Sequence, residues 1–267
     1  MGDGVMVLGI DVGGTGIKAA TVDVQKGVLV SERHRIVTPK PATPEAVAQV
    51  VRHLVGHFHW TGPIGCGVPC VIKKGVAYTA ANLDKSWIDT DGRRLLERTT
   101  RCPVTLLNDA DAAGLAEMRF GAGAGHNGVV MMVTLGTGIG SALFVDGRLV
   151  PNTELGHLIL RGKDAERRAS DRARRENDLS WKEWAKRVRE YLGYLEDLLF
   201  PDRIIIGGGV SKEHAKFLHR LKTRAKVVPA QLLNEAGIIG AALAAKEAGL
   251  APAPGEPRTR KNPSPSR

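Results

Sequence analysis

Two segments of this chain repeat one pattern, in which an apolar run is followed by a glycine-rich turn and a second apolar run. They span residues 9–18 and residues 134–144. A β-branched and leucine-rich run that stops at consecutive glycines is typical of a buried strand that ends in a tight turn. Because the pattern occurs twice, we expect an α/β fold with two similar lobes around a central cleft.

The composition is that of a globular protein with a substantial core. Hydrophobic residues make up 43% of the 267 residues, and no apolar run approaches the roughly 18 residues that span a bilayer. The start of the chain lacks a cationic region ahead of its apolar stretch, so we expect a cytoplasmic protein that enters no membrane. Cys66, Cys70 and Cys102 are too few for a disulfide framework, and we expect buried thiols.

The net charge of +10 points to an anionic partner. Residues 251–267 are basic and rich in proline and serine, and we expect a disordered tail there. Residues 163–189 and 212–226 are also rich in lysine and arginine, so the rest of the chain stays basic without the tail. These cations are either solvated helix faces or a surface that guides a polyanion, and the sequence leaves both alternatives open.

The chain alternates between predicted strands and helices. Residues 43–57 carry the clearest helix signals, with Thr43 as N-cap, Pro44 at the first helical position and Glu45 in the first turn. Strands are predicted at residues 5–11, 16–24, 28–35, 64–68, 104–108, 129–135, 141–145 and 203–206, and further helices at residues 109–121, 180–200, 212–221 and 236–248.

The first glycine turn combines an acid with bare backbone. Asp11 ends the first strand and is followed by Gly13, Gly14 and Thr15, with Lys18 on the next strand. Glycines let backbone N–H groups approach a phosphate, while the carboxylate holds Mg²⁺ directly or through water. The alternatives are an ordinary Gly-Gly hairpin for the turn and a surface lysine for Lys18.

The second turn, at residues 134–141, offers hydroxyls and bare backbone, with Thr137 and Gly138 at its tip. Two such turns can grip both sides of a phosphate chain. Neither is a Walker loop, because GxxxxGK[ST] is absent, and neither opens a helix as a dinucleotide fingerprint requires. The formal GxGxxG match at residues 123–128 precedes a predicted strand, so we interpret it as accidental.

Asn108 and Asp109 stand at the carboxyl end of a predicted strand, where an acid can project into a cleft. A carboxylate there can take the proton of a hydroxyl that attacks a phosphoryl group, and the amide can orient the same acceptor. The competing interpretation is an Asn-Asp helix N-cap, and the spacing alone does not separate the two.

Glu154 and His157 are separated by a glycine that lets the chain turn. Both side chains can hydrogen-bond vicinal hydroxyls, as polyol recognition demands, although a surface contact is the simpler alternative. A metal at His157 lacks ligands in the sequence, because no CxxC or tight Cys/His cluster is present.

Gly207, Gly208 and Gly209 follow an apolar strand and remove every side chain from one surface, which suits a base or ribose that lies on the backbone. The alternative is a flexible turn that leads to a helix capped by Ser211.

Taken in order, LGIDVGGTGIK, LNDAD, LGTGIGSALFVDG, ELGH, GGGVS and GIIGAA resemble the motifs of the ROK family of sugar kinases from residue 8 to about residue 249. GKDAE at residues 162–166 and LSWKEW at residues 179–184 resemble the polyphosphate-dependent glucokinases and gluco/mannokinases of that family. The resemblance implies an actin-like, hexokinase-like ATPase fold (ribonuclease H-like). It also implies transfer of a phosphoryl group from inorganic polyphosphate, and from ATP, to the 6-hydroxyl of glucose, with mannose as a further acceptor.

The resemblance also assigns roles by position. It makes Asp109 the catalytic base, with Asp11 at the Mg²⁺ and residues 207–209 at the nucleoside. The sugar ligands are then Asn82, Asn108, Asp109, Glu154, His157 and Glu166, and the phosphate ligands Gly13, Gly14, Thr15, Lys18, Thr137 and Gly138. The implied small lobe comprises residues 1–108 plus 237–250, and the larger lobe residues 109–236.

The chain departs from the family pattern in one region. The zinc-binding CxCGxxGCxE stretch is replaced by charged residues 163–175, which puts structural zinc in doubt. The first strand begins too early for the helix-turn-helix of the family's repressors, so we expect no DNA partner. The family expectation is a homodimer, with residues 181–200 as either an interface helix or a core-facing one. Two rival functions stay open, namely a strictly ATP-dependent glucokinase and a non-catalytic sensor that binds sugar or polyanions.

Overall fold

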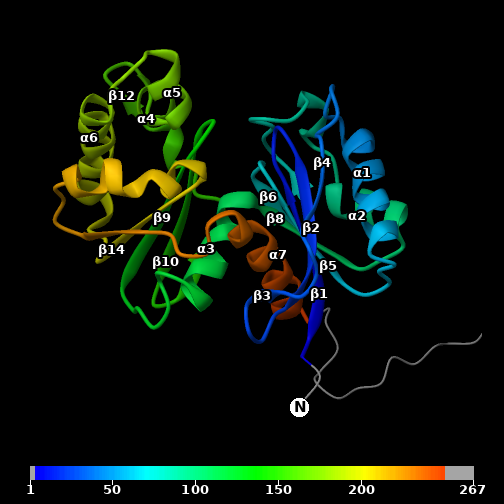
Figure 1. Ribbon diagram of the computed structural model, residues 1–267. Helices are drawn as coiled ribbons and strands as arrows, with labels where there is room; N and C mark the ends of the chain where they lie inside the picture. The colour runs from blue at the N-terminus through cyan, green and yellow to red at the C-terminus, as the bar shows by residue number, and fades with distance from the viewer. Residues whose placement is uncertain (1–3, 250–267) are drawn as a thin grey trace, which may run out of the picture.

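The computed structural model describes residues 4–249 and contains two larger mixed sheets with helices around them (Figure 1). The first sheet has the order β3-β2-β1-β5-β8, with β4 paired to β2, and the second has the order β11-β10-β9-β14-β15. The first is built from β1 (Met6–Val12), β2 (Ile17–Asp23), β3 (Val28–Leu29), β4 (His34–Ile36), β5 (Ile64–Val68) and β8 (Val104–Asn108). The second is built from β9 (Val129–Leu135), β10 (Ile139–Val145), β11 (Arg148–Val150), β14 (Arg203–Gly207) and β15 (Lys226–Pro229).

The two sheets repeat one topology. In the first, β1 pairs with β2 antiparallel and with β5 parallel, and β5 pairs with β8 parallel. In the second, β9 pairs with β10 antiparallel and with β14 parallel, and β14 pairs with β15 parallel. The repeated sequence pattern therefore corresponds to the opening hairpin of each sheet. Two short hairpins lie apart from them: β6 (Ile72–Lys73) with β7 (Val76–Ala77), and β12 (Ile159–Leu160) with β13 (Lys163–Asp164).

The helices cover the sheets and separate them. They are α1 (Pro44–His57), α2 (Gly92–Thr100), α3 (Asp109–Phe120), α4 (Glu166–Ala169), α5 (Asp171–Glu176), α6 (Trp181–Leu199) and α7 (Ala236–Glu247), with 3₁₀ helices η1 (Lys85–Trp87), η2 (Leu155–His157), η3 (Gly209–Lys216), η4 (Leu218–Arg220) and η5 (Leu233–Glu235). In Figure 1, α3 and α7 lie between the two sheets. None of the helices among the described residues has the length and apolar composition that a bilayer crossing requires.

Small residues allow α7 to sit deep between its neighbours. A Cβ at Gly240 would overlap the carbonyl oxygen of Ala112 on α3, and one at Gly65 on β5 would overlap that of Ala241. Helix and strand backbones therefore approach each other more closely than any side chain permits. This packing explains the GIIGAA sequence and ties the last helix to the first sheet.

Most predicted elements are confirmed, and local signals explain the best of them. Thr43 accepts a hydrogen bond from the Ala46 backbone N at 3.3 Å, so α1 begins at the predicted cap. Helix α6 begins with a capping box between Ser180 and Glu183, and one of its faces, which includes Trp184, Val188 and Leu192, packs into the core. The core-facing interpretation of this helix is correct, although its outer face leaves Tyr194 and other large apolar side chains exposed.

Two predicted elements are wrong. Residues 212–221 do not form an α-helix, because η3 and η4 occupy this stretch and Glu213 has non-helical backbone angles inside η3. Residues 28–35 do not form one strand, because the chain bends between the short strands β3 and β4, both of which pair with β2. The predicted basic tail at residues 251–267 lies outside the described residues.

The three cysteines are free and buried, as expected. Burial raises the pKa of each thiol above its usual value, so these side chains stay protonated and act as small apolar core residues.

Candidate active site

A cavity of about 200 Å³ lies where the two sheets meet α3 and the start of α7. Asp11 and Lys18 reach it from the first sheet, Asp109 from α3, and Thr134 from the second sheet. Its remaining walls are Ala110, Ala113, Met132, Gly208, Gly209, Leu233, Asn234, Ala236 and Gly237. Residues far apart in the sequence therefore share one small, polar pocket between the two halves of the fold.

Asp109 stands at the junction between β8 and α3, and its half-buried carboxylate forms part of the pocket wall. Burial raises its pKa to about 7, and the negative charge of Asp11 adds to that rise. Hydrogen bonding from the Ala110 backbone N, at 2.9 Å from Oδ1, works in the opposite direction. A carboxylate with a pKa near neutrality is suited to accept a proton from a hydroxyl group.

Asn108 is the N-cap of α3, so the capping interpretation of this residue is confirmed. Its Oδ1 accepts hydrogen bonds from the backbone N atoms of Ala110 at 2.8 Å and Asp111 at 3.1 Å, and its Nδ2 donates to the Cys70 carbonyl at 3.2 Å. The cap fixes where the helix begins and therefore where Asp109 points. The amide nitrogen carries a second hydrogen, so capping is compatible with a contact to an acceptor in the cleft.

Asp11 and Lys18 face each other across the β1–β2 ladder and form an ion pair of 3.0 Å between Nζ and Oδ2. The other carboxylate oxygen, Oδ1, lies beside Gly237 at the start of α7, where a Cβ would come within 3.2 Å of it. The absence of a side chain at Gly237 keeps this side of the carboxylate open. Carboxylate oxygens are the ligands that Mg²⁺ prefers, and this ion is usually held by one or two carboxylates together with phosphate oxygens and water.

The first glycine turn is held by one hydrogen bond within the turn and by two from side chains outside it. Gly13 N donates to the Gly16 carbonyl at 3.1 Å, and the Thr38 hydroxyl donates to the Gly13 carbonyl at 2.5 Å. Arg35 on β4 donates from Nη2 to the Thr15 carbonyl at 2.9 Å. Gly14 lies against Asn82, since a Cβ on this glycine would come 3.3 Å from that of the asparagine. The predicted sugar ligand Asn82 is therefore a direct neighbour of the turn.

The second glycine turn is held mainly by backbone. Gly136 N donates to the Gly138 carbonyl, and Arg172 N donates to the Gly136 carbonyl, both at 3.0 Å. Thr137 is exposed and lines a separate cavity of about 320 Å³, together with Glu166, Arg167 and Arg172. The tip of this turn therefore lines a different cavity from the one that contains Asp109.

Gly208 presses against the second turn. Its φ of +79° is a conformation that favours glycine, and a Cβ there would collide with the Leu135 backbone. The Ser211 hydroxyl donates to the Gly208 carbonyl at 2.8 Å, so it stabilises the bend and does not cap an α-helix as the sequence suggested. Gly208 and Gly209 line the pocket, whereas Gly207 is buried at the end of β14.

Three carboxylates and one imidazole lie close together around η2 and the β12–β13 hairpin, and they belong to Glu154, His157, Asp164 and Glu166. His157 lies 3.7 Å from Glu154 through Nε2 and 3.3 Å from Asp164 through Nδ1. Glu166 accepts a hydrogen bond from Ile139 N at 3.4 Å, beside Gly138. Burial raises the pKa of Glu154; the charge of Glu166 also raises it, whereas His157 lowers it. The cluster presents several hydrogen-bonding oxygens and one imidazole, as a polyol ligand requires.

The expectation that His157 lacks partners for a metal is corrected here. Ligand atoms of His157, Asp164 and Glu166 all lie within 4.8 Å of one another, so the charged segment that replaces the cysteine-rich stretch supplies two carboxylates. Sequence reasoning missed Asp164, because the short β12–β13 hairpin that brings it back to His157 leaves no periodic signal.

Sequence reasoning also missed Leu233 and Asn234 in the pocket wall, and it placed Thr134 in the second glycine turn without assigning it a role. Their only advance signals were a hydroxyl at the end of a strand and a polar segment ahead of the last helix. Asp111 was assigned no role either. It is buried in the first turn of α3, burial raises its pKa to about 6, and its Oδ2 accepts a hydrogen bond from Asn152 N at 2.8 Å.

Known proteins share both the sequence and the fold. Residues 7–170 match the model of the ROK family. Polyphosphate glucokinase of Mycobacterium tuberculosis is 49% identical over 237 residues, which cover 88% of this chain and 89% of the mycobacterial protein. Glucokinase of Streptomyces coelicolor is 27% identical, covering 91% of this chain and 98% of that protein.

Solved structures agree. The inorganic polyphosphate/ATP-glucomannokinase of Arthrobacter sp. strain KM superposes with a TM-score of 0.87 at 49% identity, covering 91% of this chain and 99% of that one. The ROK family glucokinase of Streptomyces griseus, solved with glucose and AMPPNP, gives a TM-score of 0.76 at 28% identity, with the same coverage. With the paired sheets, the two glycine turns and the acid between them, these matches establish that the chain is a member of the ROK family, with the hexokinase-like, actin-like ATPase fold.

Proposed function

We propose that this protein is a polyphosphate- and ATP-dependent glucokinase, which transfers the terminal phosphoryl group of the donor to the 6-hydroxyl of glucose. The observation that carries the proposal is Asp109, a carboxylate with a pKa of about 7 in the wall of a small pocket that Asp11 and Lys18 of the first hairpin and Thr134 of the second hairpin also line. A sensor would not require a base poised near neutrality. The names of the relatives at 49% identity support the same donor and acceptor.

In the proposed reaction, Glu154, His157 and Glu166 bind the hydroxyls of the sugar ring, with Asn82 and Asn108 at its far side. This arrangement is supported by the cluster around His157 and by the contact between Asn82 and the first turn. Binding the ring at several points directs the primary alcohol toward Asp109 and excludes water from the site.

Asp109 then accepts the proton of the 6-hydroxyl while the alcohol oxygen forms a bond to the terminal phosphorus. The bond between that phosphorus and its bridging oxygen breaks, and the electron pair leaves with the donor chain, which becomes ADP or a polyphosphate shorter by one unit. The Gly14 backbone N–H and the Thr15 and Thr137 hydroxyls are proposed to hold the oxygens of the transferred and neighbouring phosphates, and Gly13, which has no side chain, lets those oxygens approach the turn. Lys18 adds a positive charge close to them.

Asp11 fits a role as ligand of Mg²⁺, because Gly237 leaves its Oδ1 side open and the pocket lies directly beside it. When bound, the ion supplies positive charge that neutralises the phosphoryl oxygens. For ATP, the bare backbone at Gly208 and Gly209 is proposed to lie beneath the nucleoside, and Gly207 supports that surface from the end of β14.

The same proposal includes the division into lobes of residues 1–108 plus 237–250 and residues 109–236. The packing of α7 on β1 and β5 supports it, because the last helix returns to the first sheet. Mannose as a second acceptor, a homodimer and a cytoplasmic location complete the proposal.

The test is to incubate the protein with glucose, Mg²⁺ and either polyphosphate or ATP, and to measure glucose 6-phosphate. We expect product from both donors. Asp109→Asn should lower turnover by a factor of about 10² to 10⁴, since this is the usual contribution of a positioned base. Asp178→Asn is the matched control, because this aspartate is exposed beyond α5, and it should keep the activity of the parent protein. Product from ATP alone would indicate a strictly ATP-dependent kinase, and product from neither donor would favour the sensor.

A further inference from the structure

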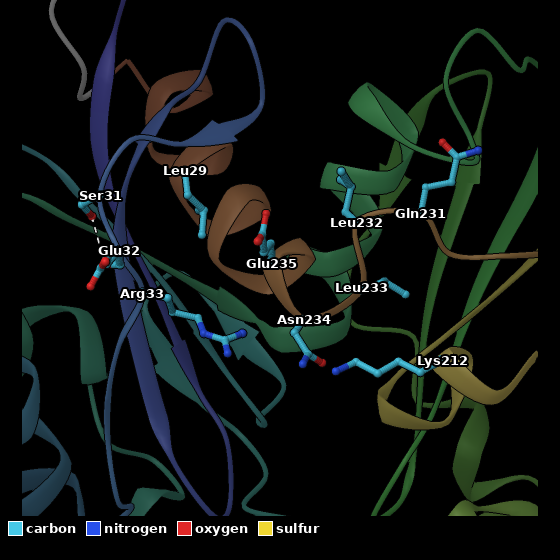
Figure 2. A pocket seen from close by; sticks show the side chains of 10 residues that line it. All are labelled: Leu29, Ser31, Glu32, Arg33, Lys212, Gln231, Leu232, Leu233, Asn234 and Glu235. Carbon is cyan, nitrogen blue, oxygen red and sulfur yellow. Dashed lines mark hydrogen bonds between the residues drawn. The ribbon is translucent and has the colours of Figure 1, made fainter.

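A second and larger groove, of about 740 Å³, lies between the first sheet and the segment that precedes α7 (Figure 2). One wall is the stretch that joins β3 to β4, from Leu29 to Arg33. The opposite wall is formed by Lys212 on η3 and by residues 231–235. The groove therefore has one side on each half of the molecule, as the catalytic pocket does.

The groove continues from the catalytic pocket. Leu233 and Asn234 line both spaces, and Lys212 follows closely after Gly209, which lines the pocket. A ligand whose end lies between Asp11 and Asp109 can therefore extend past Asn234 into the groove without crossing the protein interior.

Two cations face each other at this junction. In Figure 2, the side chains of Arg33 and Lys212 are directed toward Asn234 from opposite walls. Both side chains are exposed, and among residues 4–249 no ion pair is formed by either. Two carboxylates also line the groove, but Glu32 points away from Lys212, and Glu235 lies toward Leu29 and Leu232 at the other end.

The position of Arg33 relative to the first glycine turn is fixed by its neighbour. Arg35 donates to the Thr15 carbonyl, and a Cβ at Gly16 would overlap its guanidinium group. The segment that carries Arg33 is thereby attached to the turn proposed to hold the transferred phosphate. A cation at this place lies along the path of the donor and costs no rearrangement of the fold.

We propose that the groove is the binding site for the part of an inorganic polyphosphate chain beyond the transferred phosphate, with Arg33 and Lys212 binding it from the two sides. This inference rests on the proposed function. A polyanion carries charge on every unit and so gains from cations placed outside the catalytic pocket, whereas the cationic junction offers nothing specific to a neutral adenosine. Binding one chain from both walls would also hold the two halves of the protein together around the donor.

The experiment uses the full chain with Arg33→Gln, Lys212→Gln and the double variant. Initial rates of glucose phosphorylation are measured with long-chain polyphosphate, tripolyphosphate and ATP at several salt concentrations. Lys182→Gln is the matched control, because this lysine is exposed on α6, away from the groove. We expect each groove variant to raise KM for long-chain polyphosphate about threefold to tenfold, as for loss of one charge-assisted contact in partly screened surroundings. KM for tripolyphosphate and for glucose should stay close to the parent values.

The salt dependence adds a second readout. KM for long-chain polyphosphate in the parent protein should rise steeply with salt, and each groove variant should show a smaller slope, because one fewer counterion is displaced from the chain. Equal KM values for long-chain polyphosphate in the parent and the double variant would overturn the proposal. So would a rise confined to ATP, which would assign the groove to the nucleoside. If the parent protein used no polyphosphate at all, the proposed function itself would fail, which is a distinguishable result.

Discussion

The two opening hairpins have the same backbone plan but carry different chemistry at the same step. In β1–β2, Asp11 is paired with Lys18 one step before the turn, and their side chains form an ion pair of 3.0 Å. In β9–β10, the equivalent step pairs Thr134 with Gly140, and the Gly140 backbone N donates to the Thr134 hydroxyl at 3.1 Å. One hairpin thus brings a carboxylate and an ammonium group to the pocket, and the other brings only a hydroxyl and bare backbone.

This difference indicates a division of labour, in which the first hairpin acts on the donor through charge and the second through hydrogen bonds and shape. A phosphoryl group in transfer carries negative charge that must be balanced, and formal charges near it act more strongly than in water because Asp11 and Lys18 are partly buried. In the proposed reaction, the first hairpin supplies that balance through Lys18 and through Asp11 with the ion it is proposed to hold. The second hairpin is then proposed to position the donor by shape and hydrogen bonds. Changes to the two hairpins should therefore have unequal consequences.

The largest expected effect comes from removing the charge at this step of the first hairpin. Asp11→Asn should lower turnover by about 10² to 10³, which is typical of losing a group that stabilises developing charge. Thr134→Val, at the matching step of the second hairpin, should cost less than about tenfold, since it removes one neutral hydrogen bond. Steady-state rates with saturating glucose and either donor measure both. Equal losses in the two variants would contradict the division of labour.

The pH dependence sharpens the same comparison. Because the base must be ionised and the pKa of Asp109 is about 7, kcat/KM should fall about tenfold per pH unit below that value. The negative charge of Asp11 helps to raise this pKa, so in Asp11→Asn the residual activity should decline only at lower pH. Thr134→Val should show the same fall in kcat/KM below about pH 7 as the parent protein. If kcat/KM stayed constant between about pH 5 and about pH 8, the assignment of Asp109 as the catalytic base would be wrong.

A smaller effect is expected for the support of the first turn. Arg35→Ala removes the guanidinium that donates to the Thr15 carbonyl and covers Gly16. The turn should become less ordered, and KM for both donors should rise about threefold to tenfold, the usual net value of one intramolecular hydrogen bond. Arg94→Ala is the control, because this arginine pairs with Asp91 on the surface of α2. No change in donor KM would show that the turn needs no support from β4.

The smallest effect concerns stability. The pKa of Asp109 is about 7 in the folded protein against an ordinary value of 3.8, so folding favours the protonated form. This aspartate therefore costs no stability at low pH, and its cost grows as pH rises from about 4 to 7 and is complete above that. Asp109→Asn should raise Tm at pH 8 by about 2–4 °C for each kcal/mol of this cost, and by almost nothing at pH 4. Thermal unfolding at the two pH values measures this, and a variant less stable than the parent at pH 8 would contradict the expected cost of the charge.

Local signals carried much of the fold. The termini of α1, β5, β8 and β9 follow from a cap, a proline or an uninterrupted apolar run, each of which acts within a few residues. The stretch at residues 212–221 shows the limit of such signals. Its cations and apolar residues are compatible with an α-helix, but the Ser211 hydroxyl donates to the Gly208 carbonyl and the chain continues as 3₁₀ turns with a break at Glu213.

The site was predicted where a motif marks the end of a strand, as at Asp11 and Asp109. Residues that reach the pocket by tertiary packing alone left no trace in the sequence. Asn234 joins the pocket because α7 returns between the sheets, and Asp164 reaches His157 because a short hairpin folds back. Neither contact follows from a periodicity or a residue spacing in the sequence, so neither could be predicted from it.

The account depends on the position of one carboxylate relative to the primary alcohol of the sugar. A crystal structure of the protein with glucose, solved without a donor, tests this most directly. The account predicts the 6-hydroxyl oxygen at about 2.6–3.2 Å from an Asp109 carboxylate oxygen, within hydrogen-bond reach, with the ring bound by Glu154 and His157. A glucose whose primary alcohol points away from Asp109, while its ring occupies the same cluster, would contradict it.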